Sequence, residues 1–210
     1  MSDDAELFER WVAGESAAGN ALIRRHFQTV HRFFRTKASH EVEDLIQRTF
    51  LAAVEARDRF RRASSFRTFL LGLARIELLN HYRRRARPGS QFDELVTAAH
   101  ALGSSPSVQL GRNEEQRLLL EALCRIPVEF QLVLELSYWE RLSSRELGEV
   151  LEIPAPTVRS RLRRARELLE AELSKVSASD DARHSVMTNL DAWASAVRKA
   201  MDEPEPGSEP

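Results

Sequence analysis

An arginine cluster in the second half of the chain is the strongest chemical feature of the sequence. Five of the eight residues from Arg159 to Arg166 are arginine, within the stretch IPAPTVRSRLRRARELL (153–169). At about 100° per residue, five apolar residues fall on one stripe of a helix: Val158, Leu162, Ala165, Leu168 and Leu169. Most of the arginines fall outside this stripe, and Arg161 lies at its edge. The pattern predicts a helix with one face in a core and another toward a negatively charged partner.

A second basic cluster lies earlier in the chain. Residues 59–87 contain nine arginines and one glutamate, although the formal net charge of the whole chain is only −1. Residues 175–210, in contrast, contain four basic and seven acidic residues. Charge segregated in this way indicates a polyanion partner at two places. The alternative from charge alone is a solvated, arginine-rich surface.

Composition and length set the class of protein. With 210 residues, of which 42% are hydrophobic, the chain is long enough for two small domains with their own cores. Its single cysteine, Cys124, excludes an internal disulfide and a cysteine-based zinc cluster. No apolar run approaches the roughly 18 residues that cross a bilayer, and the acidic start lacks the pattern of a secretory signal. We therefore expect a cytoplasmic protein with no membrane insertion, no metal and no cofactor.

Almost every periodic segment has the helical period, which predicts an all-α fold. Residues 4–35 suit two helices broken near AGESAAG, with apolar positions that include Phe27. The segment 41–56 places Val42, Leu45, Ile46, Phe50, Ala53 and Val54 on one side, and 65–85 forms a third long pattern. A stretch rich in Gly, Pro, Ser and Ala then indicates a flexible linker. We expect two small helical domains at 1–88 and 114–174, joined by a linker at 89–113 and followed by a tail at 175–210.

The second domain has the order of elements found in a helix-turn-helix. Pro127 suits the first turn of a helix. Ser143 and Glu146 then form a capping-box pattern before the short helix RELGEVL. The prolines of EIPAP prevent this helix from continuing, and the arginine-rich helix follows. In a helix-turn-helix the second helix enters the major groove, so DNA is the expected negative partner.

Three of these segments together resemble a known family. DLIQRTF (44–50), SSFRTFLLGLARIELLNHYRRR (64–85) and LSSRELGEVLEIPAPTVRSRLRRAR (142–166) are similar to bacterial sigma-70 family sigma factors of the extracytoplasmic-function group. The resemblance covers about residues 5–172. It implies a non-enzymatic initiation subunit that binds core RNA polymerase and promoter DNA and is controlled by an anti-sigma factor, with no small-molecule substrate. In this reading 1–88 is region 2 and 114–174 is region 4.

The resemblance also implies where polymerase and the minus-ten element bind. The helix around 41–56 would dock on polymerase through residues off its apolar stripe: Asp44, Gln47, Arg48, Leu51 and Glu55. Family members usually carry an acid where Arg48 stands. The minus-ten residues would be Phe60, Arg61, Arg62, Ser64, Ser65, Phe66, Arg67, Ile76, Asn80, Arg83 and Arg84. The two phenylalanines offer stacking surface for a flipped base or, equally, ordinary core, and the arginines would hold phosphates. Ile76 stands where Asn is usual in the family and Asn80 where Asp is usual.

In the second domain the resemblance implies recognition of the minus-thirty-five element. The residues facing DNA would be Thr157, Arg159, Ser160, Arg161, Arg163 and Arg164. Arginine either binds guanine O6 and N7 bidentately or contacts phosphate. Pro156 stands where the family often has glycine, and proline is acceptable at a helix start.

Two other classes of function compete with this interpretation. A helix-turn-helix regulator that never contacts polymerase would explain residues 114–174 but not the basic block of the first domain or DLIQRTF. An enzyme is disfavoured because the six histidines are scattered and neither a phosphate-binding glycine loop nor a metal-ligand spacing is present.

The tail has a pattern of its own, which the family does not explain. SVMTNLDAWASAVRKAM (185–201) places Val186, Leu190, Trp193 and Val197 on one stripe, which predicts one amphipathic helix. An isolated helix of this length is marginal in water, so the stripe needs a partner. Either the tail packs on the sigma domains as a structural element, or it binds another protein or restrains DNA binding, for example by lying over an arginine surface.

Overall fold

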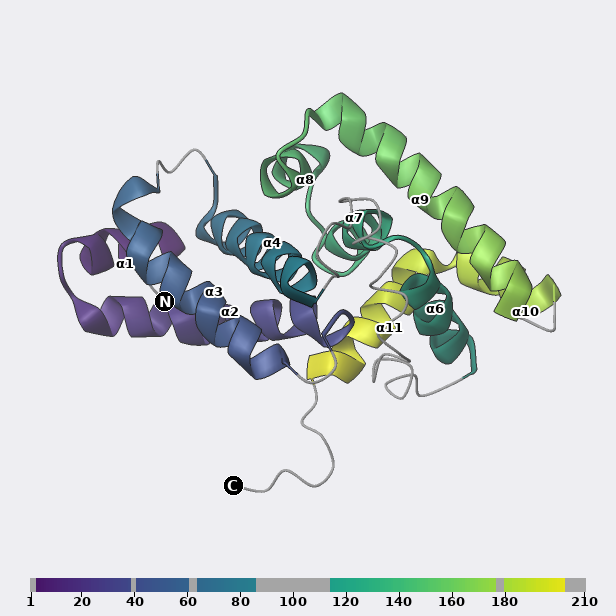
Figure 1. The fold of residues 1–210 in the computed structure, drawn as a ribbon, viewed down its shortest axis with the longest axis horizontal. Helices are drawn as coiled ribbons and strands as arrows, with labels where there is room; N and C mark the ends of the chain where they lie inside the picture. Colours follow the sequence, from purple (N-terminus) through teal and green to yellow (C-terminus); the bar gives the residue numbers. More distant parts are fainter. Residues whose placement is uncertain (1–2, 39–40, 61–63, 86–113, 177–179, 203–210) are drawn as a thin grey trace, which may run out of the picture.

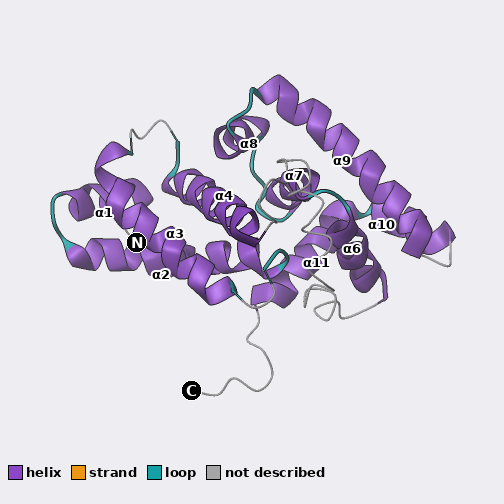
Figure 2. Ribbon diagram, viewed as in Figure 1, coloured by secondary structure: helices purple, strands orange, loops and turns teal. Residues whose placement is uncertain are grey.

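Helices form every regular element in the part of the chain that the structure describes (Figure 2). This structure, a computed structural model, describes residues 3–38, 41–60, 64–85, 114–176 and 180–202. The all-α class predicted from the sequence is confirmed. The predicted linker at 89–113 and the acidic end at 203–210 lie outside the described residues. None of the described helices combines the length and the apolar character that crossing a bilayer would need.

The first four α-helices form an N-terminal bundle (Figure 1). They are α1 (Asp4–Val12), α2 (Ser16–Arg35), α3 (Val42–Ala56) and α4 (Phe66–Arg85), with a short 3-10 helix at Arg57–Arg59. Phe34 and Leu45 are fully buried in its core. α1 and α2 approach closely at Gly19, where a Cβ would lie only 2.4 Å from the indole nitrogen of Trp11. The break near AGESAAG is where the sequence predicted it.

The next four helices form a C-terminal bundle (Figure 1). They are α6 (Glu114–Arg125), α7 (Val128–Tyr138), α8 (Ser144–Leu151) and α9 (Ala155–Val176). Pro127 is the residue directly before α7. The predicted capping box is present: Ser143 accepts a hydrogen bond from the Glu146 amide, and the Glu146 carboxylate accepts one from the Ser143 amide. The capping box fixes the start of α8, the first helix of the helix-turn-helix.

The C-terminal tail packs against the C-terminal bundle. It consists of α10 (Asp180–Thr188) and α11 (Leu190–Asp202), so a break at Asn189 divides the stripe that predicted one helix. Val186, Leu190 and Val197 are buried in a cluster with residues of α6, α7 and α9, and Trp193 is half-buried. The apolar stripe of the tail therefore has its partner within the chain.

The two bundles lie against each other, with α8 beside α4 (Figure 1). The core of the N-terminal bundle continues without a break into the apolar residues Val128 and Leu132 of α7 and Leu147 and Leu151 of α8. α11 reaches across the junction and contacts both α2 and α7. This closed arrangement brings surfaces of the two halves together that the sequence analysis treated separately.

Candidate nucleic-acid interface

The arginine-rich helix α9 divides into the two predicted faces. Val158, Ala165 and Leu169 are buried, and Leu162 and Leu168 are half-buried against the cores. Of the six residues predicted to face DNA, four are exposed: Arg159, Ser160, Arg163 and Arg164. Thr157 and Arg161 are half-buried, and the Arg161 guanidinium lies 3.9 Å from the carboxylate of Glu129. The outer face of α9 therefore presents positive charge to solvent.

Two exposed arginines on α9 share one carboxylate. Arg164 Nη1 donates to Glu167 Oε2 at 3.0 Å, and Arg163 Nε lies 3.8 Å from Glu167 Oε1. The Arg163 side chain is 82% exposed, so this ion pair leaves the guanidinium accessible. Exposed pairs of this kind contribute little to stability, which leaves both side chains available to a phosphate or a base.

The angle between α8 and α9 depends on a close backbone approach at Gly148. A Cβ at this position would lie 2.7 Å from the carbonyl oxygen of Ile153, in the turn. The Ile153 amide donates to the Gly148 carbonyl at 3.0 Å, and Glu152 between them adopts a left-handed conformation with φ of 56°. Glycine is thus required here for the turn that sets the direction of α9.

The loop before α4 differs in part from what the resemblance implied. Phe66 is only 4% exposed and packs among Phe8, Trp11 and Phe69, so its ring belongs to the core and offers no stacking face in this structure. Phe60 is half-buried, with its ring 4.6 Å from that of Phe69. Of the two alternatives left open for these rings, ordinary core describes Phe66.

Polar residues of the same loop cap α4. Ser65 is exposed, and its hydroxyl accepts a hydrogen bond from the Thr68 amide at 3.1 Å, as a helix N-cap does. Ser64 is half-buried, and Arg61 and Arg62 lie outside the described residues. Ser65 therefore has a structural role whether or not it also contacts DNA.

One face of α4 remains open for a ligand. Ile76 is 43% exposed, an unusual position for a large apolar side chain, and Arg83 and Arg84 are exposed near the helix end. Asn80 is half-buried and accepts a hydrogen bond from Arg83 at 3.1 Å. Ile76, Asn80 and Arg83 recur at helical spacing, so they share a face.

Arg67, which the resemblance placed among the minus-ten residues, contacts the C-terminal bundle. Its guanidinium donates to the carboxylate of Glu140 and, at 2.6 Å, to the Glu140 carbonyl oxygen. Arg32 of α2 donates to the same carboxylate at 2.9 Å. Burial alone would raise the pKa of Glu140, but the hydrogen bonds and charges of Arg32 and Arg67 outweigh it and hold this pKa below its ordinary value.

A second buried acid, Glu135, lies five residues before Glu140, in the last turn of α7. Glu135 accepts hydrogen bonds from Lys37, from the Thr36 hydroxyl at 3.1 Å and from Gln131 at 2.8 Å. Burial raises the pKa of Glu135, and the Lys37 charge offsets only part of that effect. Both acids at this end of α7 are therefore paired with basic side chains of the N-terminal bundle.

All five residues predicted to contact polymerase are exposed on α3: Asp44, Gln47, Arg48, Leu51 and Glu55. Arg48 donates to Asp44 at 2.7 Å along the helix. The Leu51 side chain is the most exposed large apolar residue of the described chain, at 57%.

The apolar surface around Leu51 is larger than the sequence predicted. Val54 and Phe27, both assigned to buried stripes, are 38% and 41% exposed. The Phe27 ring stacks on that of Phe50, at 6.4 Å between centroids, and Phe50 lies one helical turn from Val54. Leu51, Val54 and Phe27 thus add exposed apolar side chains to the surface of α2 and α3.

Comparison with known protein families identifies the family of both bundles. A family model described as Sigma-70 region 2 matches residues 22–88, which include α3 and α4, and a model described as Sigma-70, region 4 matches residues 116–169, which include the helix-turn-helix. The chain belongs to the sigma-70 family. The tail helices α10 and α11 lie beyond both matches.

Relatives place this sigma factor in the extracytoplasmic-function group. It is 27% identical over 179 residues to the ECF RNA polymerase sigma-E factor of Haemophilus influenzae, an alignment that covers 81% of this chain and 95% of the relative. It is 29% identical over 185 residues to the RNA polymerase sigma-H factor of Pseudomonas aeruginosa, covering 82% and 95%. The ECF RNA polymerase sigma-E factor of Escherichia coli K12 is 28% identical over 176 residues, covering 80% and 92%.

These matches decide between the two functions that the sequence left in competition. The protein is a transcription initiation factor that binds core RNA polymerase and directs it to promoters. A helix-turn-helix regulator independent of polymerase is not favoured, because the region 2 match accounts for the N-terminal bundle that this alternative leaves without a role.

Sequence reasoning missed the residues that join the two bundles. Glu140 follows an apolar helix as one acid among many, and no local pattern distinguishes it from a solvated one. Arg32 has the spacing of a surface residue near a helix end, yet it is 5% exposed. Gly148 could have been found from the sequence, because a glycine inside a predicted helix is unfavourable and indicates that another segment of backbone comes close.

Proposed function

We propose that this sigma factor binds core polymerase through the exposed face of α3, composed of Asp44, Gln47, Arg48, Leu51 and Glu55. The observation that carries the proposal is the 57% exposure of Leu51, with Val54 and Phe27 extending the apolar surface. An apolar centre with a charged rim is the usual composition of a protein interface.

The test is a double variant, Gln47→Ala with Leu51→Ala, measured for affinity to core polymerase. Both side chains are exposed, so we expect the fold to stay intact by circular dichroism while core binding weakens. Val12→Ala is the control, because Val12 is an apolar residue 41% exposed on a different helix, α1. Equal core affinity of the double variant and the control would refute the assignment.

We propose that the minus-ten element is bound by the open face of α4 and the loop before it. The residues are Phe60, Arg61, Arg62, Ser64, Ser65, Arg67, Ile76, Asn80, Arg83 and Arg84. Arginines there would hold phosphates of the melted strand, and Ile76 and Phe60 would contact bases. Arg84→Ala in the holoenzyme should slow promoter melting, monitored with a fluorescent base analogue, while binding to the minus-thirty-five element stays unchanged.

The minus-thirty-five element is, in this proposal, recognised by Thr157, Arg159, Ser160, Arg161, Arg163 and Arg164 of α9. The exposed outer face of the helix supports it, since Arg159, Ser160, Arg163 and Arg164 need no rearrangement of the core to reach a groove. Arg163→Ala or Arg164→Ala should cost about 1–3 kcal/mol at one promoter position if a base contact is lost, and weaken all sequences alike if a phosphate contact is lost. Lys175→Ala, further along the same helix, is the control.

We further propose that the protein acts in the cytoplasm, as a non-enzymatic subunit without a cofactor, and that an anti-sigma factor controls it. The family role supports these points: an initiation subunit contributes binding surfaces, and the chemistry of RNA synthesis belongs to polymerase. Co-purification of the full chain from its native cells, followed by identification of stoichiometric partners, would test the anti-sigma factor directly.

A further inference from the structure

The turn between α7 and α8 holds buried charged contacts between the two bundles. Glu140, in this turn, is 5% exposed and accepts hydrogen bonds from Arg32 of α2 and Arg67 of α4. The carboxylate thus comes from the C-terminal bundle and both guanidinium groups from the N-terminal bundle. Removing the acid would leave two positive charges without their partner at a buried junction, which is strongly unfavourable.

These ion pairs stabilise the closed arrangement of the two bundles, but they do not prevent the bundles from separating. When the bundles separate, water hydrates all the charged groups, and this hydration offsets much of what the ion pairs contribute. The junction also contains the continuous apolar core described above, so opening it requires a competing partner that binds one of its two sides. Lys37 with Glu135 adds a second pair of the same kind beside the first.

Glu140 neutralises the Arg67 guanidinium, so it competes with a DNA phosphate for this side chain. Both contacts of Arg67 with Glu140, to the carboxylate and to the carbonyl oxygen, are made by Nη2, and the Arg67 side chain is only 29% exposed. This step rests on the proposed function, which places Arg67 among the minus-ten residues. The outer face of α9, in contrast, stays exposed in the same structure. The closed arrangement therefore masks part of one DNA-binding surface and leaves the other free.

Helix α11 fixes the turn that presents Glu140. Arg198 donates to the carbonyl oxygen of Trp139 at 3.0 Å, and Arg141 donates to the Ser195 hydroxyl at 3.3 Å, so the tail contacts the residues on both sides of Glu140. Arg141 has a φ of 52°, a left-handed conformation that a non-glycine residue adopts at a cost. The turn therefore needs support from its surroundings.

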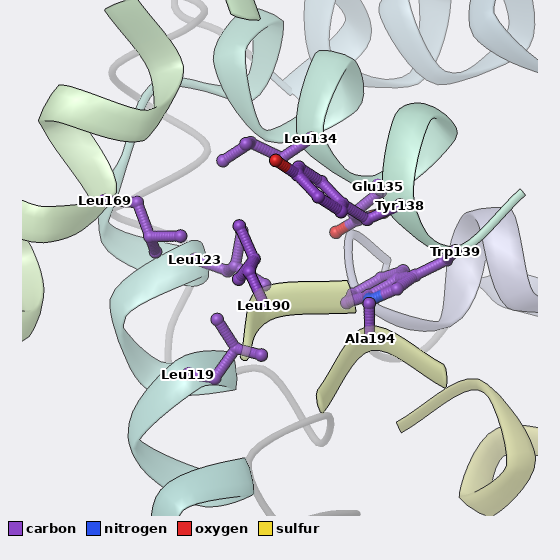
Figure 3. A pocket seen from close by; sticks show the side chains of 9 residues that line it. All are labelled: Leu119, Leu123, Leu134, Glu135, Tyr138, Trp139, Leu169, Leu190 and Ala194. Atoms are coloured by element: carbon purple, nitrogen blue, oxygen red, sulfur yellow. The ribbon is translucent and has the colours of Figure 1, made fainter. Parts of the chain in front are cut away.

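The apolar side of α11 gives the same turn a second support. Trp139 is 4% exposed, and in Figure 3 its ring lies against Ala194, with Leu190 beside it toward Leu119 and Leu123. α11 also contacts α2 on the other side of the junction. Arg159, Arg163 and Arg164 of α9 are exposed with the described part of the tail in place, so α11 acts at the junction and not over that surface.

We propose that α11 is an internal restraint on DNA binding: it fixes residues 139–141 so that Glu140 occupies Arg67 and keeps the bundles closed. The tail acts at the junction and not at the minus-thirty-five face. Binding of polymerase to the N-terminal bundle, or displacement of α11, opens the junction and frees Arg67 for the melted strand.

The experiment uses the full chain with Glu140→Gln, and Arg198→Ala as a separate variant that leaves the acid in place. Glu149→Gln is the matched control, because it removes the same charge from an exposed pair with Arg145 on α8. Spin labels at Glu43 and Glu170, exposed residues of α3 and α9, report the distance between the bundles in a Cys124→Ala background. A single-stranded DNA pool of random sequence is the binding probe, titrated at several salt concentrations.

We expect both test variants to shift the label distances to longer values and the control to leave them unchanged. Glu140→Gln should also bind the DNA more tightly than the control. One freed phosphate contact should steepen the log–log salt dependence by about 0.7 for single strands. Adding Arg67→Ala to Glu140→Gln should remove that gain.

Two results would overturn the proposal in distinguishable ways. Unchanged distances in both test variants would show that neither Glu140 nor α11 holds the bundles closed. Longer distances with no gain in DNA binding would refute the masking of Arg67. If Arg67→Ala also bound DNA like the unmodified chain in every background, the minus-ten role of Arg67 itself would fail.

Discussion

Replacing Gly148 with alanine tests the geometry of the helix-turn-helix. A Cβ at this position would meet the Ile153 carbonyl oxygen at 2.7 Å, and backbone in a tight turn cannot move aside as a flexible side chain can. Gly72 offers a matched control, because it also lies inside a helix but a Cβ there meets nothing within 4 Å. The two substitutions share the same change in chemistry and differ in the space available.

The magnitude follows from this comparison. Alanine should stabilise a helix interior over glycine by roughly 0.5–1 kcal/mol, so Gly72→Ala should raise the free energy of unfolding by that amount. At Gly148 the same gain is offset by a steric cost of about 1–3 kcal/mol for an overpacked site. Because the gain is common to both, the difference between the two variants measures the steric cost itself.

Urea unfolding followed by circular dichroism gives both free energies. A second measurement, of affinity for minus-thirty-five DNA, should show a loss for Gly148→Ala only, because moving the turn reorients α9. If Gly148→Ala stabilised the chain as much as Gly72→Ala and bound DNA normally, the turn would not lie as close to Gly148 as the structure shows.

Three other predictions concern the stability of the fold. Leu173→Ala, at a fully buried position of α9, should lower the free energy of unfolding by about 2–5 kcal/mol, whereas Leu51→Ala at an exposed position should change it little. Ser143→Ala removes a helix cap and should cost about 0.5–2 kcal/mol in the same urea assay. Burial lowers the pKa of His26, and Asp4 offsets only part of that shift, so protonation favours the unfolded chain. Stability should therefore fall as the pH drops below about 6.5 toward the lowered pKa, and thermal melts of His26→Gln should show a flatter dependence there.

Much of the fold could be predicted because its determinants are local. The capping box at Ser143, the prolines after α8 and the 3.6-residue period of α9 each act over a few residues, so the helix boundaries follow from the sequence. The exposed faces of α3 and α9 follow in the same way, since a residue off the apolar stripe of a packed helix faces outward.

What could not be predicted depends on contacts between distant segments. Phe27 and Val54 fit an apolar stripe, but no neighbouring helix covers them fully, and only the packing of α2 on α3 decides this. Phe66 could equally be core or stacking surface until the aromatic cluster around it was known. Glu140 and Arg32 are 108 residues apart, and pairing at that separation leaves no periodic trace.

Transcription with purified core RNA polymerase tests the central claim most directly. The full chain, added to core polymerase and a library of genomic fragments, should produce transcripts that begin at defined positions downstream of a shared sequence. Arg163→Ala combined with Arg164→Ala should reduce those transcripts, while Lys175→Ala should leave them intact. If the chain bound DNA but neither joined core polymerase nor changed where transcripts begin, it would act without polymerase and the account would be wrong.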